Sequence, residues 1–371
     1  MATITCEKAS LAQALGIVTR TVTTRATLPI LSNILIKAEG GQLQLASTNL
    51  EVGITLQIDA KTDASAETTL PARILSDLVN TLGDAEVSLH LNGTPDADLR
   101  CGPVKAKLKG LDATDYPSMP GWIHQDGSAL DAAAFREMLY QVTFAASADT
   151  TRPVLNGVLL EMDGRHLTLA ATDGFRLALR QHEFSKALTD KPRKLVIPAS
   201  ALKELVRLIG LENEPVDLVL PKSGSQIIFQ HGRLQVISQL VDGNFPDYKM
   251  ILPKSHKTKI TVSTEGLLKA CKQAEIIARD GQNVVILKAE GEELSVSASA
   301  EETGLSESRL PARIEGDALE IAFNVRFLRE FLSVVKSPEV LLQGNTHKTP
   351  MSLSPSGNSN YQYILMPVHV G

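Results

Sequence analysis

Asp173 is the acidic residue whose setting most suggests chemistry. It stands in Ala-Thr-Asp-Gly at the end of an apolar run, where a carboxylate could act as a general base. Asp-Gly is also the usual composition of a turn that closes a strand, and we favour that interpretation. The sequence contains no serine-hydrolase, P-loop, HExxH, CxxC or dinucleotide-binding motif, and none of its eight histidines stands at ligand spacing from another His or Cys. We therefore expect no catalytic centre, no metal and no cofactor.

The cysteines and the apolar runs indicate the compartment. Cys6, Cys101 and Cys271 are isolated and odd in number, which argues against a disulfide framework and favours a reducing environment. The N-terminus lacks the basic start and apolar run of a signal peptide, and no stretch approaches the length of a transmembrane helix. The sequence predicts a cytoplasmic protein that does not bind membranes.

The elements that would position any site are written three times along the chain. Helix-like segments open at Pro71, Pro198 and Asn324, which are 127 and 126 residues apart. From each opening, apolar residues recur at offsets of four, seven, eight and eleven, the spacing of one helix stripe. These residues are Leu75, Leu78, Val79 and Leu82, then Leu202, Leu205, Val206 and Ile209, then Leu328, Phe331, Leu332 and Val335.

Other landmarks keep the same period. Alternating strands at 43–48, 167–172 and 294–299 begin 124 and 127 residues apart. Several features with one period indicate a triplicated domain, against the alternative of three ordinary amphipathic helices. Strand runs mixed with two helices per copy predict an α+β fold, with Pro- and Gly-rich connectors between the copies. The predicted domains are residues 1–121, 128–252 and 253–371.

The net charge of −5 argues against a generally basic nucleic-acid binder, but the charge is unevenly placed. Six expected helices hold twelve Lys or Arg against seven Asp or Glu, which makes them +5 and leaves −10 for the rest of the chain. Either these cations form ordinary solvated faces or the helices jointly face an anionic partner. The six helices are 8–20, 72–82, 131–145, 199–210, 264–279 and 324–336.

Taken together, these motifs resemble the bacterial sliding clamp, the β subunit of DNA polymerase III. The resemblance runs from the first domain to the last residues and includes the length and the threefold repeat. It is carried by Thr27-Leu-Pro-Ile-Leu31, Leu155-Asn-Gly157, Ala171-Thr-Asp-Gly-Phe-Arg-Leu177, Leu240-Val-Asp-Gly-Asn-Phe-Pro-Asp-Tyr248, Phe323-Asn-Val325 and Tyr363-Ile-Leu-Met-Pro367.

The resemblance implies an architecture and a set of partners. Each domain would hold two small antiparallel sheets and two helices, and two chains would join head to tail in a closed six-domain ring. The helices would surround double-stranded DNA, whose phosphates bind cations without regard to sequence. The implied function is a processivity factor of the DNA polymerase III holoenzyme without catalysis of its own. The other implied partners are the polymerase III α subunit, the clamp-loader ATPase, and further polymerases and repair proteins that carry a clamp-binding motif.

Cations beside the apolar stripe of the second helix in each copy are the expected DNA contacts. They are Arg73, Lys203, Arg207, Arg326 and Arg329, together with Arg25 in the loop before Thr27. The position six residues after each helix opening is acidic in all three copies, namely Asp77, Glu204 and Glu330. Pairing with a nearby helix cation is one explanation of these acids.

The ring joint is expected between exposed edge strands. Lysines alternate in Val104–Gly110 and glutamates occur in Ser297–Ser308, so we predict that these segments pair across the joint. A lysine-rich edge strand that only prevents aggregation is the alternative. The joint residues are Lys105, Lys107, Leu108, Lys109, Ile276, Ile277, Glu301 and Glu302.

Clamps of this family bind short peptides, roughly Gln-Leu-x-Leu-Phe, in an apolar pocket between the second and third domains. Aliphatic side chains beside Gly174 would form an adaptable slot for such a peptide. Two departures bear on peptide preference: Phe175 stands where His is familiar, and the chain ends in Val368-His-Val-Gly371. The matching positions are Arg152, Leu155, Thr172, Gly174, Phe175, Arg176, Leu177, Pro246, Met250, Ile251, Ile364, Met366 and Pro367.

Two other classes of protein stay open. An enzyme could place its site at a domain junction around Asp173, although no acid–base cluster accompanies it in the sequence. A triplicated scaffold that never closes would have no reason to gather its excess cations on helices. A clamp paralogue that serves inhibitor resistance is a variant of the leading interpretation.

Overall fold

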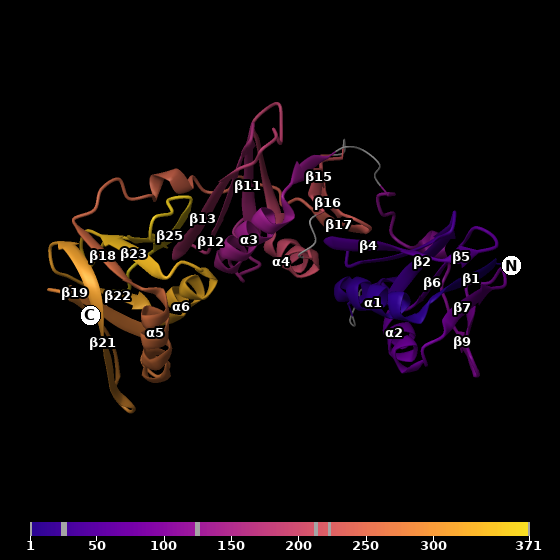
Figure 1. Ribbon diagram of the computed structural model, residues 1–371, viewed down its shortest axis with the longest axis horizontal. Helices are drawn as coiled ribbons and strands as arrows, with labels where there is room; N and C mark the ends of the chain where they lie inside the picture. Colours follow the sequence, from indigo (N-terminus) through magenta and orange to yellow (C-terminus); the bar gives the residue numbers. More distant parts are fainter. Residues whose placement is uncertain (1, 24–27, 123–126, 211–213, 222–223, 370–371) are drawn as a thin grey trace. The chain divides into compact units, whose positions relative to one another are not determined.

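The structure, a computed structural model, describes residues 2–23, 28–122, 127–210, 214–221 and 224–369 (Figure 1). Arg25, a predicted DNA contact, lies outside these residues. The chain divides into two compact units, and each is described here by itself. Unit 1 comprises Met1–Ala133 and Glu204–Leu240, and unit 2 comprises Ala134–Lys203 and Val241–Gly371. Among the described residues no helix is both long and apolar enough to cross a bilayer.

Six α-helices lie where the amphipathic spacing predicts them, so these six predictions are confirmed. They are α1 (Lys8–Val18), α2 (Ala72–Thr81), α3 (Ala132–Val142), α4 (Ala199–Leu208), α5 (Thr264–Ala278) and α6 (Val325–Val334). Each helix ends slightly before the predicted residue. After α1 and α3 the chain tightens into the 3₁₀ turns η1 (Thr19–Thr21) and η4 (Thr143–Ala145), a common way to end a helix. The other 3₁₀ turns are η2 (Pro29–Ser32), η3 (Ala113–Asp115) and η5 (Tyr248–Met250).

Unit 1 holds two antiparallel sheets. The five-stranded sheet has the order β5-β1-β7-β8-β9, and the eight-stranded sheet has the order β10-β15-β16-β17-β4-β3-β2-β6. Helix α1 packs against α2 and against strands β3 and β4. The bounds are β1 (Ala2–Glu7), β2 (Asn33–Glu39), β3 (Gln42–Thr48), β4 (Val52–Asp59), β5 (Lys61–Thr62), β6 (Ala66–Pro71), β7 (Glu86–Leu91), β8 (Ala97–Cys101), β9 (Val104–Leu108), β10 (Ser128–Leu130), β15 (Val216–Val219), β16 (Gln226–His231) and β17 (Leu234–Gln239).

Unit 2 holds a twelve-stranded antiparallel sheet with the order β14-β11-β12-β13-β25-β24-β23-β18-β21-β20-β19-β22. Helix α5 packs against α6 and against β20 and β21. The bounds are β11 (Gly157–Asp163), β12 (His166–Thr172), β13 (Arg176–Glu183), β14 (Arg193–Pro198), β18 (Thr258–Ser263), β19 (Val284–Glu290), β20 (Glu293–Ala300), β21 (Gly304–Gly316), β22 (Leu319–Asn324), β23 (Glu339–Gly344), β24 (Met351–Pro355) and β25 (Tyr361–Leu365).

Successive repeats share a sheet through one pair of strands in each unit. In unit 1, β4 of the first repeat pairs with β17 of the second, and Gly53 lies opposite Ile237. In unit 2, β13 of the second repeat pairs with β25 of the third, and Leu177 lies opposite Ile364. Both joins use the same strands of the repeat, and each removes two strand edges from solvent.

Two strand edges carry residues predicted for the ring joint. β9 is the last strand of its sheet, so its outer backbone groups have no strand partner among the described residues. The segment Ser297–Ser308, predicted for the joint, spans a hairpin in which a turn at 301–303 connects β20 and β21. The turn is possible because Gly304, with a φ of +101°, adopts a conformation that other residues avoid. Since β21 pairs with β18 only from Ala312 onward, its edge at 304–311 is open, with no second strand partner in the described part of the chain.

The three cysteines are free and buried, which suggests a simple test of the cores. Burial raises the pKa of the Cys6 and Cys271 thiols to about 12 each, so both are protonated at pH 8. Because the thiolate is the reactive form, we expect native protein to react very slowly with a disulfide reagent and unfolded protein to release three equivalents. Fast reaction of a native thiol would contradict this packing.

Candidate functional site

The predicted pocket is built around a hydrogen-bonded turn between β12 and β13. The hydroxyl of Thr172 donates to the carbonyl of Arg176 and accepts from the N–H of Gly174, at 2.6 and 3.1 Å. Oδ1 of Asp173 accepts from the N–H groups of Phe175 and Arg176, at 2.9 and 3.1 Å. Gly174 has a φ of +94°, which explains why a glycine is suited to the bend.

The guanidinium of Arg176 lies under this turn and is almost fully enclosed, with 7% of its side chain exposed. Its Nε donates to Oδ2 of Asp173 at 2.9 Å, its Nη2 donates to the carbonyl of Phe144 at 3.0 Å, and its Nη1 donates to Glu330. The ring of Phe327 lies 4.3 Å below the guanidinium carbon. Each guanidinium nitrogen therefore already has a partner within the unit.

Asp173 is thus a structural carboxylate, which agrees with the turn interpretation. Its Oδ1 accepts from two backbone N–H groups and its Oδ2 pairs with Arg176, so both oxygens are engaged. In the described part of the chain, no group of three or more His, Cys, Asp or Glu could hold a metal ion.

An apolar cluster forms the floor beneath the turn. Leu177 and Ile364, which face each other across the β13–β25 join, are both 1% exposed. They pack with Tyr248 from the connector between the second and third repeats. The hydroxyl of Tyr248 donates to Oε2 of Glu161 at 2.6 Å, and Lys194 pairs with Oε1 of the same carboxylate at 2.6 Å. This polar anchor was not predicted, because the tyrosine and the glutamate are 87 residues apart.

Four predicted pocket residues that lie close in sequence to members of this cluster have exposed apolar side chains, and they are called the rim here. The exposed fraction is 66% for Phe175, 84% for Met250, 39% for Ile251 and 38% for Met366. The N–H of Met366 donates to the carbonyl of Phe175 at 2.9 Å, so the turn and the C-terminal segment are linked. Such adaptable side chains suit an apolar peptide.

The other predicted pocket residues have mixed settings. Arg152 and Pro246 are exposed, and Leu155 and Pro367 are half-buried. The carbonyl of Arg152 accepts from the N–H of Leu155 at 3.0 Å, which closes a turn in that loop. The predicted set therefore divides into exposed residues and buried residues.

The first repeat contains the same turn. Thr48 donates to the carbonyl of Val52 and accepts from the N–H of Leu50, at 3.1 and 3.0 Å, as Thr172 does in its own turn. Leu50 has a φ of +77° and stands where Gly174 stands in the second repeat. In place of the bulky Leu177, β4 has Gly53, and the terminal carbon of Met119 fills the space beside it. The framework of the turn is repeated, but its apolar side chains are not.

The cations predicted to contact DNA lie on α2, α4 and α6. Four of them are exposed: Arg73, Lys203, Arg207 and Arg326. Arg207 also pairs with Glu204 one turn earlier. Arg329 is half-buried because its Nη1 lies 2.7 Å from Oε2 of Glu275, a carboxylate on α5 that is 4% exposed. Arg329 therefore also ties α6 to α5, a role that helix spacing alone did not indicate.

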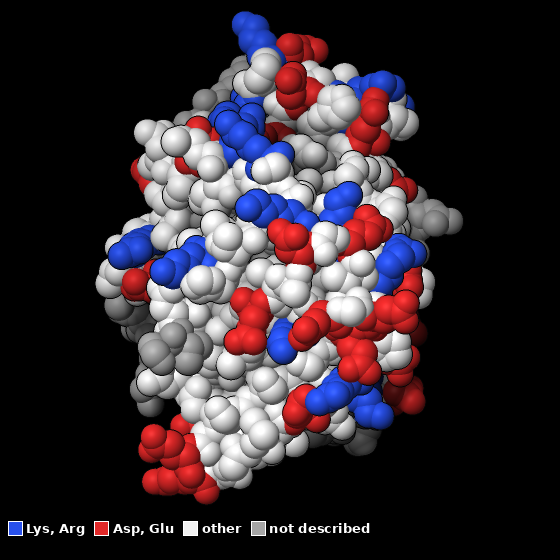
Figure 2. Space-filling model, turned by 90° about the vertical axis from the view of Figure 1, so that its left-hand side faces the viewer, with Lys and Arg blue, Asp and Glu red and all other residues white. Residues whose placement is uncertain are grey.

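The residues predicted for the ring joint differ in how much surface they offer. Ile276 is 67% exposed, whereas Leu108 is 6% exposed and already packed within its own sheet. Lys109 lies beyond β9, and the hydrogen bond from its Nζ, at 2.7 Å, holds the pKa of Asp96 below its usual value. Glu301 and Glu302 are exposed at the hairpin turn. Figure 2 views the left-hand side of Figure 1 and shows acidic side chains gathered at its bottom, the level to which the β20–β21 hairpin projects in Figure 1.

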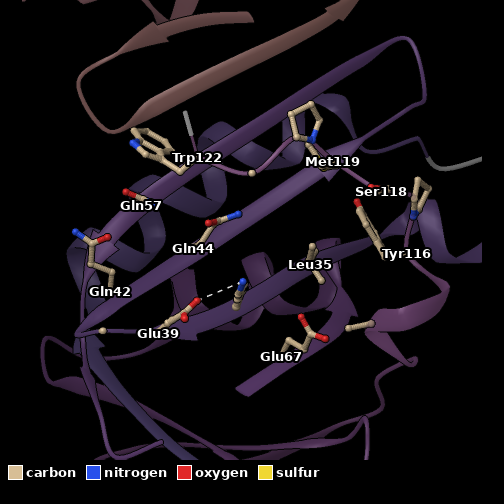
Figure 3. Close-up of a pocket in the computed structure, with 16 residues that line it drawn as sticks. Leu35, Glu39, Gln42, Gln44, Gln57, Glu67, Tyr116, Ser118, Met119 and Trp122 are labelled. Atoms are coloured by element: carbon tan, nitrogen blue, oxygen red, sulfur yellow. Dashed lines mark ion pairs between the residues drawn. The ribbon is translucent and has the colours of Figure 1, made fainter. Parts of the chain in front are cut away.

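A polar hollow of about 550 Å³ lies in unit 1, between the eight-stranded sheet and the connector that follows the first repeat (Figure 3). The connector contributes Tyr116 and Trp122 to its wall. An ion pair of 3.3 Å between Lys37 and Glu39 neutralises one end. Amides are prominent on the floor, so the hollow can form hydrogen bonds. The floor glutamines are Gln42, Gln44 and Gln57.

Comparison with known proteins agrees with the repeat. Models of the DNA polymerase III beta subunit match the chain in succession, with the N-terminal domain at residues 2–120, the central domain at 129–247 and the C-terminal domain at 249–369. The chain is 32% identical to the beta sliding clamp of Synechococcus elongatus over 372 residues, which cover 99% of each chain. It is 28% identical to that of Staphylococcus epidermidis over 359 residues, 94% of each chain.

Solved structures give the same result. The DNA polymerase sliding clamp from Bacillus subtilis superposes with a TM-score of 0.95 at 28% identity, over 100% of both chains. The clamp from Pseudomonas aeruginosa bound to griselimycin superposes with a TM-score of 0.92 at 27% identity, also over 100% of both. Because three domain models match in the order of the repeats and the relatives align along nearly the whole chain, this chain belongs to the bacterial DNA polymerase III β subunit family, the β sliding clamps.

Proposed function

We propose that two copies of this chain close head to tail into a ring around duplex DNA and tether DNA-processing proteins to it. The threefold repeat carries this proposal, because its two internal joins are built from the same pair of strands. Units that join by a repeated geometry can continue around a ring, and identical chains favour closed symmetry. The protein would perform no chemistry of its own and would act in the cytoplasm, where the bacterial chromosome lies.

The charge distribution supports the DNA part of the proposal. Exposed Lys and Arg lie on the second helix of every repeat, although the chain as a whole carries −5. Cations that contact only phosphates attract any sequence and lose affinity as salt rises. Weak attraction of this kind permits sliding, while the closed ring retains the protein on DNA.

The exposed rim of unit 2 supports the tethering part. We expect it to take the apolar motif of the polymerase III α subunit, of the clamp-loader ATPase that opens the ring, and of other polymerases and repair proteins. Burying one Leu and one Phe of a partner at about 25 cal/mol per Å² supplies several kcal/mol, which the ordering of the peptide partly offsets. A dissociation constant of roughly micromolar size is the expected result.

Titration of a fluorescent Gln-Leu-Ser-Leu-Phe peptide tests the pocket. We expect saturable binding to the wild-type chain and at least about tenfold weaker binding to a Phe175→Ala, Met366→Ala variant, because both side chains are exposed rim residues. Substitution at Leu177 is avoided, since that buried side chain supports the core and its loss would confuse folding with binding.

Tyr140→Ala is the matched control, because Tyr140 is also an exposed aromatic residue of unit 2, 50% exposed, but lies on α3 and outside the predicted pocket. It should leave the affinity unchanged. No binding by folded wild-type protein, or equal binding by all three forms, would remove the pocket from the proposal.

A further inference from the structure

The acid six residues after the opening of each second helix now has a structural explanation in two repeats. In unit 1, Glu204 on α4 forms an ion pair with Arg20 of the first repeat, whose Nη1 lies 3.3 Å from Oε2 of Glu204. In unit 2, Glu330 on α6 forms an ion pair with Nη1 of Arg176 of the second repeat. The ion-paired residues are 184 and 154 positions apart, so each acid links its repeat to the preceding one. The acid is therefore a feature of the joins between repeats.

The two links differ in what the arginine supports. Arg20 lies in the 3₁₀ turn η1 that follows α1, and its side chain is 41% exposed. The side chain of Arg176 is 7% exposed and lies beneath the turn that carries Phe175. Arg176 is linked to this turn by its hydrogen bond to Asp173. The turn is linked to the C-terminal segment by the hydrogen bond from the N–H of Met366 to the carbonyl of Phe175. A change in the position of Arg176 would therefore move the rim of the pocket.

Glu330 is the group that fixes Arg176 from the far side. It reaches one end of the guanidinium while Asp173 and the carbonyl of Phe144 hold the other nitrogens. Charge-assisted hydrogen bonds of this kind are directional and about twice as strong as neutral ones. The residue lies on α6, outside every pocket position that the sequence predicts.

We propose that Glu330 is a positioning residue of the peptide pocket, which acts through Arg176 to fix the turn that carries Phe175. This inference rests on the proposed function, because it names how the third repeat sets the affinity of that pocket. Glu330 does not touch the peptide. It determines where Phe175 and the linked Met366 stand before the peptide arrives, and such preorganisation raises affinity by lowering the ordering cost.

The test is a double-mutant cycle with the same labelled Gln-Leu-Ser-Leu-Phe peptide. Glu330→Gln keeps the size of the side chain and removes its charge, and we expect its dissociation constant to rise about tenfold. In a Phe175→Ala background the same substitution should change the affinity less than threefold, because the side chain being positioned is gone. An equal effect in both backgrounds would overturn the positioning role.

Glu204→Gln is the matched control, since it removes the equivalent link of unit 1. It should leave peptide affinity at the wild-type value, whereas a general loss of stability would weaken both variants alike. Absence of binding by the wild type itself would overturn the pocket. Normal binding by wild type and Glu330→Gln would leave the pocket intact and overturn only this inference.

Discussion

Replacing Lys105, Lys107 and Lys109 together by glutamate is expected to raise the dissociation constant of the proposed dimer at least about 100-fold. The substitutions reverse the charge along the open edge of β9, which we expect to face the open edge of β21 and the glutamates of its hairpin turn. Like charges brought together across an interface cost several kcal/mol. Sedimentation velocity over a range of protein concentrations measures the shift from dimer to monomer.

Lys61→Glu provides the control for this experiment. Lys61 lies on β5, at the opposite edge of the same sheet, and its side chain is 82% exposed. Its reversal should leave the dimer constant within a factor of two or three. If the triple variant sediments like the wild type, the paired edges are not the joint and β9 only resists aggregation.

Arg176→Met is expected to destabilise unit 2 by about 3–5 kcal/mol, because it removes the cation of the enclosed Asp173, whose side chain is 15% exposed, and also the partner of the more exposed Glu330. For a unit of this size the melting temperature should fall by about 10 °C. Scanning calorimetry is suited to the measurement, since a multidomain chain need not unfold in one step.

Arg20→Met tests whether burial is the cause of that loss. The ion pair of Arg20 with Glu204 has a comparable place in unit 1 but lies at the surface. Exposed pairs contribute at most about 1 kcal/mol, so its removal should lower the melting temperature by no more than about 3 °C. Equal losses in the two variants would show that the enclosure of Arg176 does not determine its contribution.

The repeat made the main elements predictable. Apolar side chains at fixed offsets from Pro71, Pro198 and Asn324 place α2, α4 and α6, because one buried stripe is a strong and local signal. The turn at Asp173 was also predictable, since Asp-Gly chemistry acts within a few residues. The hairpin inside Ser297–Ser308 was not, because Ser and Ala alternate up to the turn and Glu-Glu-Thr-Gly is a weak turn signal.

The supporting groups of the site could not be read from the chain. Arg176 and Glu330 meet only after the second and third repeats join. The same is true of Tyr361 of the third repeat, whose hydroxyl donates to the backbone carbonyl of Gln141 of the second at 2.8 Å. Sequence spacing gave no information on which candidate residues would be buried. It therefore grouped Leu177 and Arg176, which are buried, with Phe175 and Met366, which are exposed.

Asp77 is the first-repeat counterpart of Glu204 and Glu330, and it is exposed and forms no ion pair with the described residues. Ile74, one turn earlier on α2, is 58% exposed. Three repeats in line have two internal joins, so one joining face is left over at each end of the chain. Each chain would therefore offer two joining faces, and in the proposed head-to-tail dimer Asp77 would meet the repeat of the other chain that precedes its own.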